Sequence, residues 1–372
     1  MTSDDLVLPG PSASTVPESA ETETGKPPAS AEPEAATVDR WSRAYAGWMV
    51  VARKEFTDHL LSIRFLVLIL VLGVAAFVPL YFAAQRIGSL ASSVSGEPAV
   101  FLALFFITSD PTSSAGVAVP GVFDFLRLFA PLLGVAFAFD AVNGERSEGT
   151  LPRLLSQPIH RDDVINGKFA AGLAIIGLVI VGVILFVAGV GIFRLGIIPA
   201  PTEILRLFVW ILVTLVYVSL WLAFGMMLSV LIRSAATSAL IGFGSWFVLT
   251  FFGGFLLSFV AGAIAPLSET LASTNPEQYL ANSGLRDMLF RVLPNTLYGE
   301  SSIVLLNPSR TRVADLPGSV DQVVQAQQQI GSLLSLDQSF IIVWPQVVAL
   351  VALTVLCFGV AYVRFMRQEV RA

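Results

Sequence analysis

The chain has 372 residues, of which 55% are hydrophobic and only 13% are charged. Soluble domains carry about 25% charged residues, so this composition and a mean hydropathy of +0.76 exclude an ordinary soluble protein. The formal net charge of −5 and the lack of a strong basic patch argue against a nucleic-acid partner. Lipid must therefore be the solvent for much of the chain.

Residues 1–39 form an acidic tail that differs from the rest of the sequence. They hold eight carboxylates and one base, Lys26, so the tail carries −7 and residues 40–372 carry +2. Pro, Ser, Ala, Thr and Glu dominate it, and almost no large apolar residue could offset the cost of ordering it. We expect a disordered cytoplasmic tail followed by one membrane domain at 40–372.

Residues 41–64 have the pattern of an amphipathic helix. Its aromatic residues recur at helical spacing, beginning with Trp41 and Trp48, and its charged residues include Arg53, Lys54 and Glu55. Such a helix suits the headgroup region, with its aromatic rings toward the lipid and its cations near phosphates. The alternative is a solvated helix that packs on a partner.

Six apolar segments are long enough to cross a bilayer, which takes about 20 residues of α-helix. The predicted spans are 65–85, 122–142, 169–193, 205–232, 236–264 and 340–364. The fold class expected is therefore an all-α integral membrane protein with six transmembrane helices. Lys54, Lys168 and most arginines near span ends would then lie on one side, which predicts a multi-pass cell-membrane protein with both termini in the cytoplasm.

Two shorter regions would lie on the outer side. The run 99–108 is too short to cross and would dip into the outer leaflet or pack as a loop helix. The polar segment 265–339 contains Asn275 and Pro276, a cap and first residue of a helix. Its helices would lie on the outer membrane surface or pack over the outer mouth of the spans, and the sequence leaves both open.

The predicted spans carry no charge in their centres. Intramembrane charges mark ion and proton pathways, so their absence disfavours a proton-coupled carrier, an ion pump and an intramembrane hydrolase. Asp124 and Arg127 lie at the predicted outer end of the second span, where we expect a structural pair. One cysteine, Cys357, and two distant histidines, His59 and His160, give no reason to expect a metal site.

The segment 139–168 is the most informative part of the sequence. Gly144 can end the second span, and Thr150 can cap a short helix that Pro158 stops after about two turns. Leu151, Leu154 and Leu155 share one face of that helix. Such a face suits the groove of a partner, or equally the surface of the membrane.

The residues of this segment resemble a known signature. From Phe139 the sequence reads Phe-Asp-x-x-x-Gly-Glu-Arg-x-x-Gly-Thr-Leu-x-x-Leu-Leu-Ser-x-Pro-Ile-x-Arg, and it ends on Gly167-Lys168. This pattern is similar to that of ABC transporter permeases of the type-2 export class, in the branch that includes permeases of nitrous oxide reductase maturation and gliding motility. Ala52-Arg53-Lys54-Glu55-Phe56 also resembles the family's first helix.

The resemblance implies a permease that pairs with a second copy or a sister permease and is powered by two cytoplasmic ABC ATPase subunits. The residues it implies for ATPase coupling are Glu145, Arg146, Gly149, Thr150, Leu151, Leu154, Leu155, Pro158, Arg161 and Lys168. The leucine face would dock on the ATPase. Glu145 and Arg146 would hold the base of the second span against neighbouring charges.

No phosphate-binding loop of the form G-x-x-x-x-G-K-[ST] occurs in the sequence, because Gly167-Lys168 lacks both the earlier glycine and the following hydroxyl. The chain is therefore not expected to be an enzyme or to hold a cofactor, and ATP and Mg²⁺ would bind the partner ATPase. Two alternatives stay open. One is a mechanical ABC subunit that acts through 265–339 on an extracytoplasmic partner, and the other is an ATP-independent carrier.

Overall fold

The structure is a computed structural model that describes residues 40–89, 100–106, 120–150, 159–307 and 334–367. All regular elements in these ranges are helices, and six of them are long and apolar enough to cross a membrane. The tail 1–39, the predicted short helix at 151–158 and the stretch 308–333 lie outside the described residues.

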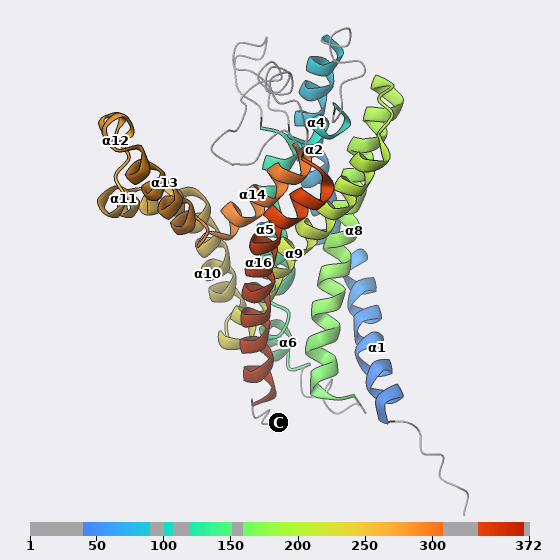
Figure 1. The fold of residues 1–372 in the computed structure, drawn as a ribbon. Helices are drawn as coiled ribbons and strands as arrows, with labels where there is room; N and C mark the ends of the chain where they lie inside the picture. Colours follow the sequence, from blue (N-terminus) through green and yellow to red (C-terminus); the bar gives the residue numbers. More distant parts are fainter. Residues whose placement is uncertain (1–39, 90–99, 107–119, 151–158, 308–333, 368–372) are drawn as a thin grey trace, which may run out of the picture. The chain divides into compact units, whose positions relative to one another are not determined.

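The six candidate spans confirm the predicted number and order. They are α2 (Ile63–Ser89), α5 (Val122–Ala138), α8 (Arg161–Leu195), α9 (Pro201–Leu231), α10 to α11 (Ala235–Ile264) and α16 (Leu336–Met366). A further helix, α1 (Arg40–Leu60), runs beside the first turns of α8 (Figure 1). We call the end where α8 begins the inner end, and the opposite end the outer end.

The first helix of the second span ends earlier than predicted, although the whole candidate span runs from Val122 to Ser147. Helix α5 stops at Ala138, and a turn leads into the short helix α6 (Asn143–Ser147), so Gly144 lies within α6 and the prediction that it ends the span is wrong. The side-chain hydroxyl of Ser229 accepts bonds from the backbone N–H groups of Val142 and Asn143, at 3.0 and 3.2 Å. Because these two N–H groups donate to Ser229, they are used outside α5, which explains why the helix does not continue to Val142.

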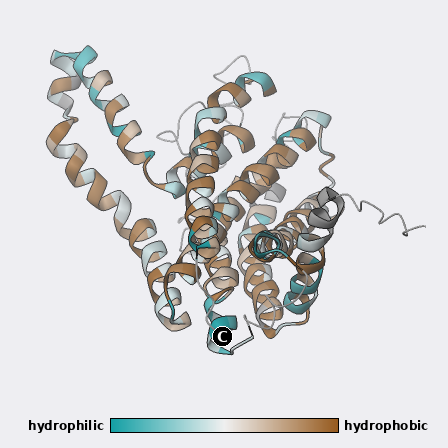
Figure 2. Cartoon of the chain, turned by 90° about the horizontal axis from the view of Figure 1, so that it is seen from below, coloured by the Kyte–Doolittle hydropathy of each residue, from teal (hydrophilic) through white to brown (hydrophobic). Residues whose placement is uncertain are grey.

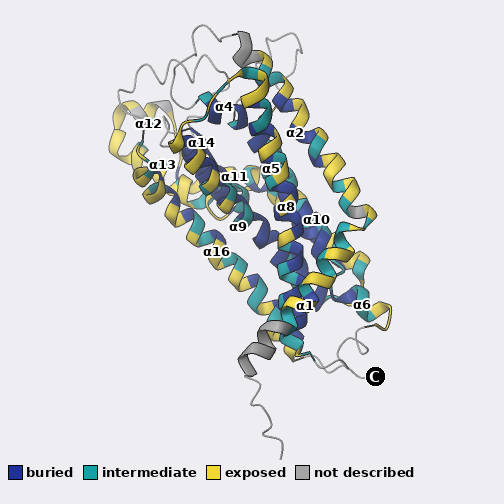
Figure 3. Ribbon diagram, turned by 90° about the vertical axis from the view of Figure 1, so that its right-hand side faces the viewer, coloured by how far each residue is buried: buried dark blue, intermediate teal, exposed yellow. Residues whose placement is uncertain are grey.

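Helix α9 is the central helix of the bundle, and its dark colour in Figure 3 marks it as largely buried. Helix α5 approaches it closely because two glycines remove side chains from the contact. A Cβ at Gly134 would lie 2.7 Å from the backbone nitrogen of Leu222, and one at Gly225 would lie 2.9 Å from the Cβ of Ala138. Small residues give this close approach in lipid, where dispersion replaces the hydrophobic effect between helices.

The fifth span packs little against the other helices along most of its length. It comprises α10 (Ala235–Phe247), the π-helical turn η1 (Val248–Phe252) and α11 (Gly253–Ile264), and most of its apolar side chains are exposed. In Figure 2 it is coloured mostly hydrophobic. Its exposed apolar side chains include Phe251, Phe255 and Phe259, as suits contact with lipid.

The outer segment returns into the bundle. After α12 (Glu269–Thr274) and α13 (Pro276–Phe290), helix α14 (Pro294–Leu306) packs against α9 and α16 with most of its residues buried. The Tyr298 ring stacks on Tyr217 at 4.4 Å, and its hydroxyl lies 3.0 Å from that of Thr214. Of the two placements left open by the sequence, α14 therefore takes the packed one, as Figure 1 shows.

Two other local predictions have clear outcomes. Asn275 caps α13 by accepting a hydrogen bond from the backbone N–H of Gln278, and Pro276 is its first residue, which confirms that prediction. The short run becomes α4 (Val100–Phe106), which is buried against α5 and α8. Glu203 accepts a bond from the Phe101 N–H at 3.2 Å, so α4 packs as a loop helix.

The glycine contact between α5 and α9 leads to a first prediction. Gly134→Val should lower the free energy of unfolding by about 2 kcal/mol, because the added methyl groups would overlap the α9 backbone. Unfolding can be followed by the reaction of a thiol-specific fluorophore with the buried Cys357. Gly182→Val is the matched control, since its Cβ would meet nothing within 4 Å. Equal melting temperatures for the two variants would contradict the proposed contact.

Candidate functional site

The structure places part of the sequence-predicted coupling region at the inner end of the bundle. Glu145, Arg146, Gly149 and Thr150 lie on α6 and the turn after it, while Arg161 and Lys168 lie in the first turns of α8. Leu151, Leu154, Leu155 and Pro158 lie outside the described residues. The coupling role of all of these residues stays a prediction.

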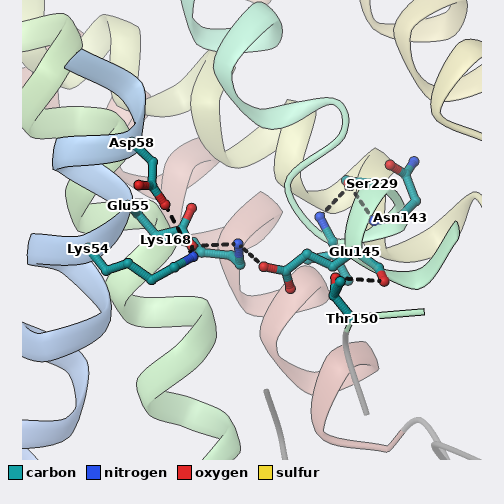
Figure 4. A network of polar contacts seen from close by, with 9 residues as sticks. Lys54, Glu55, Asp58, Asn143, Glu145, Thr150, Lys168 and Ser229 are labelled. Carbon is teal, nitrogen blue, oxygen red and sulfur yellow. Dashed lines mark hydrogen bonds and ion pairs between the residues drawn. The ribbon is translucent and has the colours of Figure 1, made fainter. Parts of the chain in front are cut away.

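Lys168 joins three helices at this end. Its ammonium lies 2.7 Å from the Glu145 carboxylate of α6 and 3.2 Å from the Glu55 carboxylate of α1 (Figure 4). Only 6% of the Lys168 side chain is exposed, so water screens these pairs little. A buried cation needs such partners, and this one fixes α1, α6 and α8 relative to one another.

Helix α1 adds a second cation to the cluster. The Lys54 ammonium lies 3.1 Å from Glu55 and 3.3 Å from Asp58, at the exposed edge of the network. Burial raises the pKa of Glu55, but the charges of Lys168 and Lys54 and their hydrogen bonds outweigh it, so the net pKa lies below 4.5. Glu55 is therefore ionised at neutral pH and can hold Lys168.

Glycines allow α1 to lie directly on α8. A Cβ at Gly167 would come within 2.8 Å of the Trp48 carbonyl oxygen and 2.7 Å of the Val51 Cβ, and one at Gly47 would overlap the Asp163 carboxylate. Asp163 is itself buried and accepts a hydrogen bond from the His160 N–H at 3.1 Å, which completes the first turn of α8. The close contact between α1 and α8 explains why the residue before Lys168 is a glycine, Gly167.

The turn after α6 is built around Gly149. Its φ of 69° is a left-handed conformation that favours glycine. This turn lets both the backbone N–H and the hydroxyl of Thr150 donate to the Glu145 carbonyl oxygen, at 3.0 and 3.2 Å. Thr150, which directly precedes the segment 151–158, is thus bonded to the residue that binds Lys168.

Helix α6 is in turn fixed to α9. Besides the two backbone bonds to Ser229, the Asn143 side-chain amide donates to the Ile232 carbonyl oxygen at 3.3 Å. Asn143 and Ser229 are fully buried. The cluster at the inner end therefore connects the start of the 151–158 segment to α1, α6, α8 and α9.

Comparison with known proteins identifies the family. Residues 49–370 match the family model described as ABC-2 family transporter protein. The chain belongs to the ABC-2 transporter family. Over 237 residues it is 27% identical to the probable ABC transporter permease protein NosY of Stutzerimonas stutzeri, which covers 61% of this chain and 73% of that protein.

Membership in the ABC-2 family makes the chain a multi-pass membrane permease subunit. The permeases of this family have no ATPase domain of their own. The match includes α1 from residue 49, the inner cluster, all six candidate spans and α14. The sequence resemblance pointed to the same family on the residues Phe139 to Lys168.

Sequence reasoning missed several residues of the inner cluster. Asn143 and Ser229 carry no motif, and their roles depend on which helices meet at this end. The role of Gly47 in the contact between α1 and α8 could have been identified only together with that of Gly167 on the other helix. Trp41, Trp48 and Arg53 lie on α1 as predicted, but the headgroup placement of that helix stays a prediction.

Removal of the central cation gives a second prediction. Lys168→Met should lower the free energy of unfolding by about 3 kcal/mol, because Glu55 and Glu145 would be left buried without their cation. The measurement is thermal unfolding followed at Cys357. Lys54→Met is the matched control and should cost far less, since 58% of the Lys54 side chain is exposed. A larger loss in the control would refute the central role of Lys168.

The lowered pKa of Glu55 predicts a pH dependence. A carboxylate with a depressed pKa contributes stability that is complete above its ordinary value of 4.5 and is lost as pH falls through the lower folded value. The difference in melting temperature between the wild type and Glu55→Gln should therefore be constant from pH 7.5 to 5 and shrink below about pH 4.5. A difference that disappears already near pH 6 would show that Glu55 is not held by the two lysines.

Proposed function

We propose that the chain is the membrane-spanning subunit of an ATP-driven exporter, coupled through 151–158 to separate cytoplasmic ABC ATPase subunits. The observation that carries the proposal is the connection of Thr150 to four helices. Thr150 is bonded to Glu145, Glu145 to Lys168, and Lys168 to Glu55, while α6 is bonded to α9. A displacement of the following segment would thus reach several spans at once.

The coupling works through rigid connections in this proposal. ATP binding would draw the ATPase subunits together and move the 151–158 segment, with its leucine face of Leu151, Leu154 and Leu155, as a lever. Because the Lys168 ion pairs are largely buried and hydrogen bonds fix α6 to α9, the displacement would turn α5, α8 and α9 rather than stretch the cluster. The spans would then alternate between inward and outward states.

The remaining components follow from the same assignment. ATP and Mg²⁺ would bind the ATPase subunits, and the permease itself would need no cofactor. A second copy or a sister permease would complete the membrane part, with its termini and the inner cluster in the cytoplasm. The basic residues Lys54, Lys168, Arg146 and Arg233 near the inner end support that orientation.

A second candidate is mechanical work on an outer partner. Helix α13 exposes Leu280, Leu285 and Met288 together with the following Val292, and this apolar side has no cover among the described residues. A partner that binds this surface would receive motion from the fifth span. Deletion of 269–290 would then abolish partner binding and leave ATPase coupling intact.

The coupling proposal predicts a specific loss of partner binding. Leu154→Asp and Leu155→Asp should each remove the ATPase from the complex purified through the permease, because a buried carboxylate would disrupt an apolar docking face. The measurement is the amount of ATPase that co-purifies from membranes. Leu280→Asp, an exposed leucine of α13, is the matched control and should retain the ATPase. Retention in both test variants would overturn the docking face.

A further inference from the structure

Asp124 and Arg127 are the third and sixth residues of α5, at the outer end of the second span as predicted, and they lie beside the middle of α9. The Tyr217 hydroxyl donates to the Arg127 carbonyl oxygen at 3.1 Å, and Tyr217 is sixteen residues into the 31-residue helix α9. At 1.5 Å per residue, that is about 24 Å from one end of α9 and about 21 Å from the other. The Trp246 indole N–H likewise donates to the Leu128 carbonyl oxygen, twelve residues inside the fifth span.

A cavity of about 270 Å³ opens beside these two charges. A water molecule needs only about 10–15 Å³ of such space. Its lining includes Asp124, Phe125, Arg127 and Leu128 of α5, Thr250 of η1 and Asn295 of α14. The cavity therefore lies where a π-helical turn interrupts the fifth span and where the returning helix α14 begins, and interruptions of this kind occur at functional sites.

The polar groups around the cavity are incompletely paired. No hydrogen bond or ion pair joins the Arg127 guanidinium to another described residue, and none joins it to Asp124. The Asn295 carboxamide oxygen is buried and accepts no hydrogen bond from the described residues. Asp124 accepts one bond, from the Gly121 N–H at 3.1 Å. The charge of Arg127 acts on Asp124, but among the described residues the Arg127 guanidinium and the Asn295 oxygen lack hydrogen-bond partners, which a bound group could supply.

The hydrogen-bonding groups around the cavity define the chemistry of the ligand. The guanidinium of Arg127 matches a phosphate, which it can bind through two parallel hydrogen bonds. The Asp124 carboxylate and the Asn295 oxygen need N–H donors, and a primary ammonium supplies three. Phe125 and Leu128 are apolar, and beyond Thr250 the exposed Leu249 and Phe251 continue an apolar surface toward the lipid. An acyl chain can extend along that surface.

We propose that this mid-bundle cavity binds the head of an amphiphile in which a primary ammonium is linked to a phosphate, as in phosphatidylethanolamine. The inference deepens the exporter assignment and rests on it, by naming a substrate class for the permease. Phosphate lies on Arg127, the ammonium lies between Asp124 and Asn295, and the apolar chains leave past the fifth span.

The test is binding to the purified full-length chain in the absence of ATP. Dioctanoylphosphatidylethanolamine should raise the melting temperature saturably, because a ligand that binds only the folded state stabilises it. The phosphatidylglycerol analogue lacks the ammonium and the phosphatidylcholine analogue lacks its N–H donors, so each should bind about tenfold more weakly. Equal protection by the three lipids would overturn the proposal.

Variants locate the binding in the cavity. Asn295→Leu should leave the lipid-free melting temperature unchanged or raise it, because its oxygen has no described partner, yet reduce the ethanolamine preference about tenfold. Arg127→Gln should weaken all phosphate lipids, whereas Arg194→Gln, an exposed arginine at the outer end of α8, should not. If Arg127→Gln does not fold, Asn295→Leu alone decides, and a retained preference in that variant refutes the site.

A final binding experiment distinguishes a lipid headgroup from a soluble ligand. Protection by free phosphoethanolamine as strong as by the lipid would assign a soluble ligand of the same chemistry, and weaker protection would assign the lipid. Because no ATPase takes part, failure here leaves the coupling proposal standing. Failure of the Leu154 and Leu155 variants to release the ATPase would equally leave the binding result standing.

Discussion

Helix α9 crosses the bundle with its polar side chains buried, and the need to pair those groups away from water organises the helices around it. At the inner end the Ser229 hydroxyl holds the turn into α6. Near the middle, Thr214 and Tyr217 contact Tyr298 of α14, and Tyr217 also bonds to the α5 backbone. At the outer end Arg206 donates to the Leu334 carbonyl oxygen at 2.6 Å and to the Ser339 hydroxyl at 3.0 Å. Each level ties a different segment to the same helix, because lipid offers these groups no partner.

The inner and middle levels have different chemistry, and this difference suits separate tasks. In the inner cluster the carboxylates of Glu55, Asp58 and Glu145 pair with Lys168 or Lys54, so these ion pairs can transmit a displacement without changing partners. The middle level has an open cavity and incompletely paired groups, as a site that must exchange a ligand requires. Helix α5 joins them directly, since Asp124 and Arg127 lie near its start and Glu145 follows its end after one turn. A short rigid helix is thus the physical link between the proposed coupling and binding regions.

The fifth span is the exception to this close packing. Its π-helical turn adds a residue to one turn, and beyond that turn most of its side chains are exposed. Leu293, just before α14, fills the space left by Gly253, where an added Cβ would come within 2.8 Å of it. That contact brings the start of α14 to the middle of the bundle and so forms one wall of the cavity. The same element also leads to α13, whose apolar residues are exposed.

The sequence by itself determined the class of protein, the six spans and the family, because runs of about 20 apolar residues and the Phe139 to Lys168 pattern are local properties of the chain. It also identified Lys168 and Glu145 as important, through resemblance. The tertiary structure alone decided that they pair with each other and with Glu55, since these residues meet only when α1, α6 and α8 come together. It also decided which residues lie beside Asp124 and Arg127. Hydropathy counts the residues of a span from its own ends, whereas the neighbours of a residue depend on the packing of the helices, and here Tyr217 of α9 and Trp246 of the fifth span bond to the backbone at the start of α5.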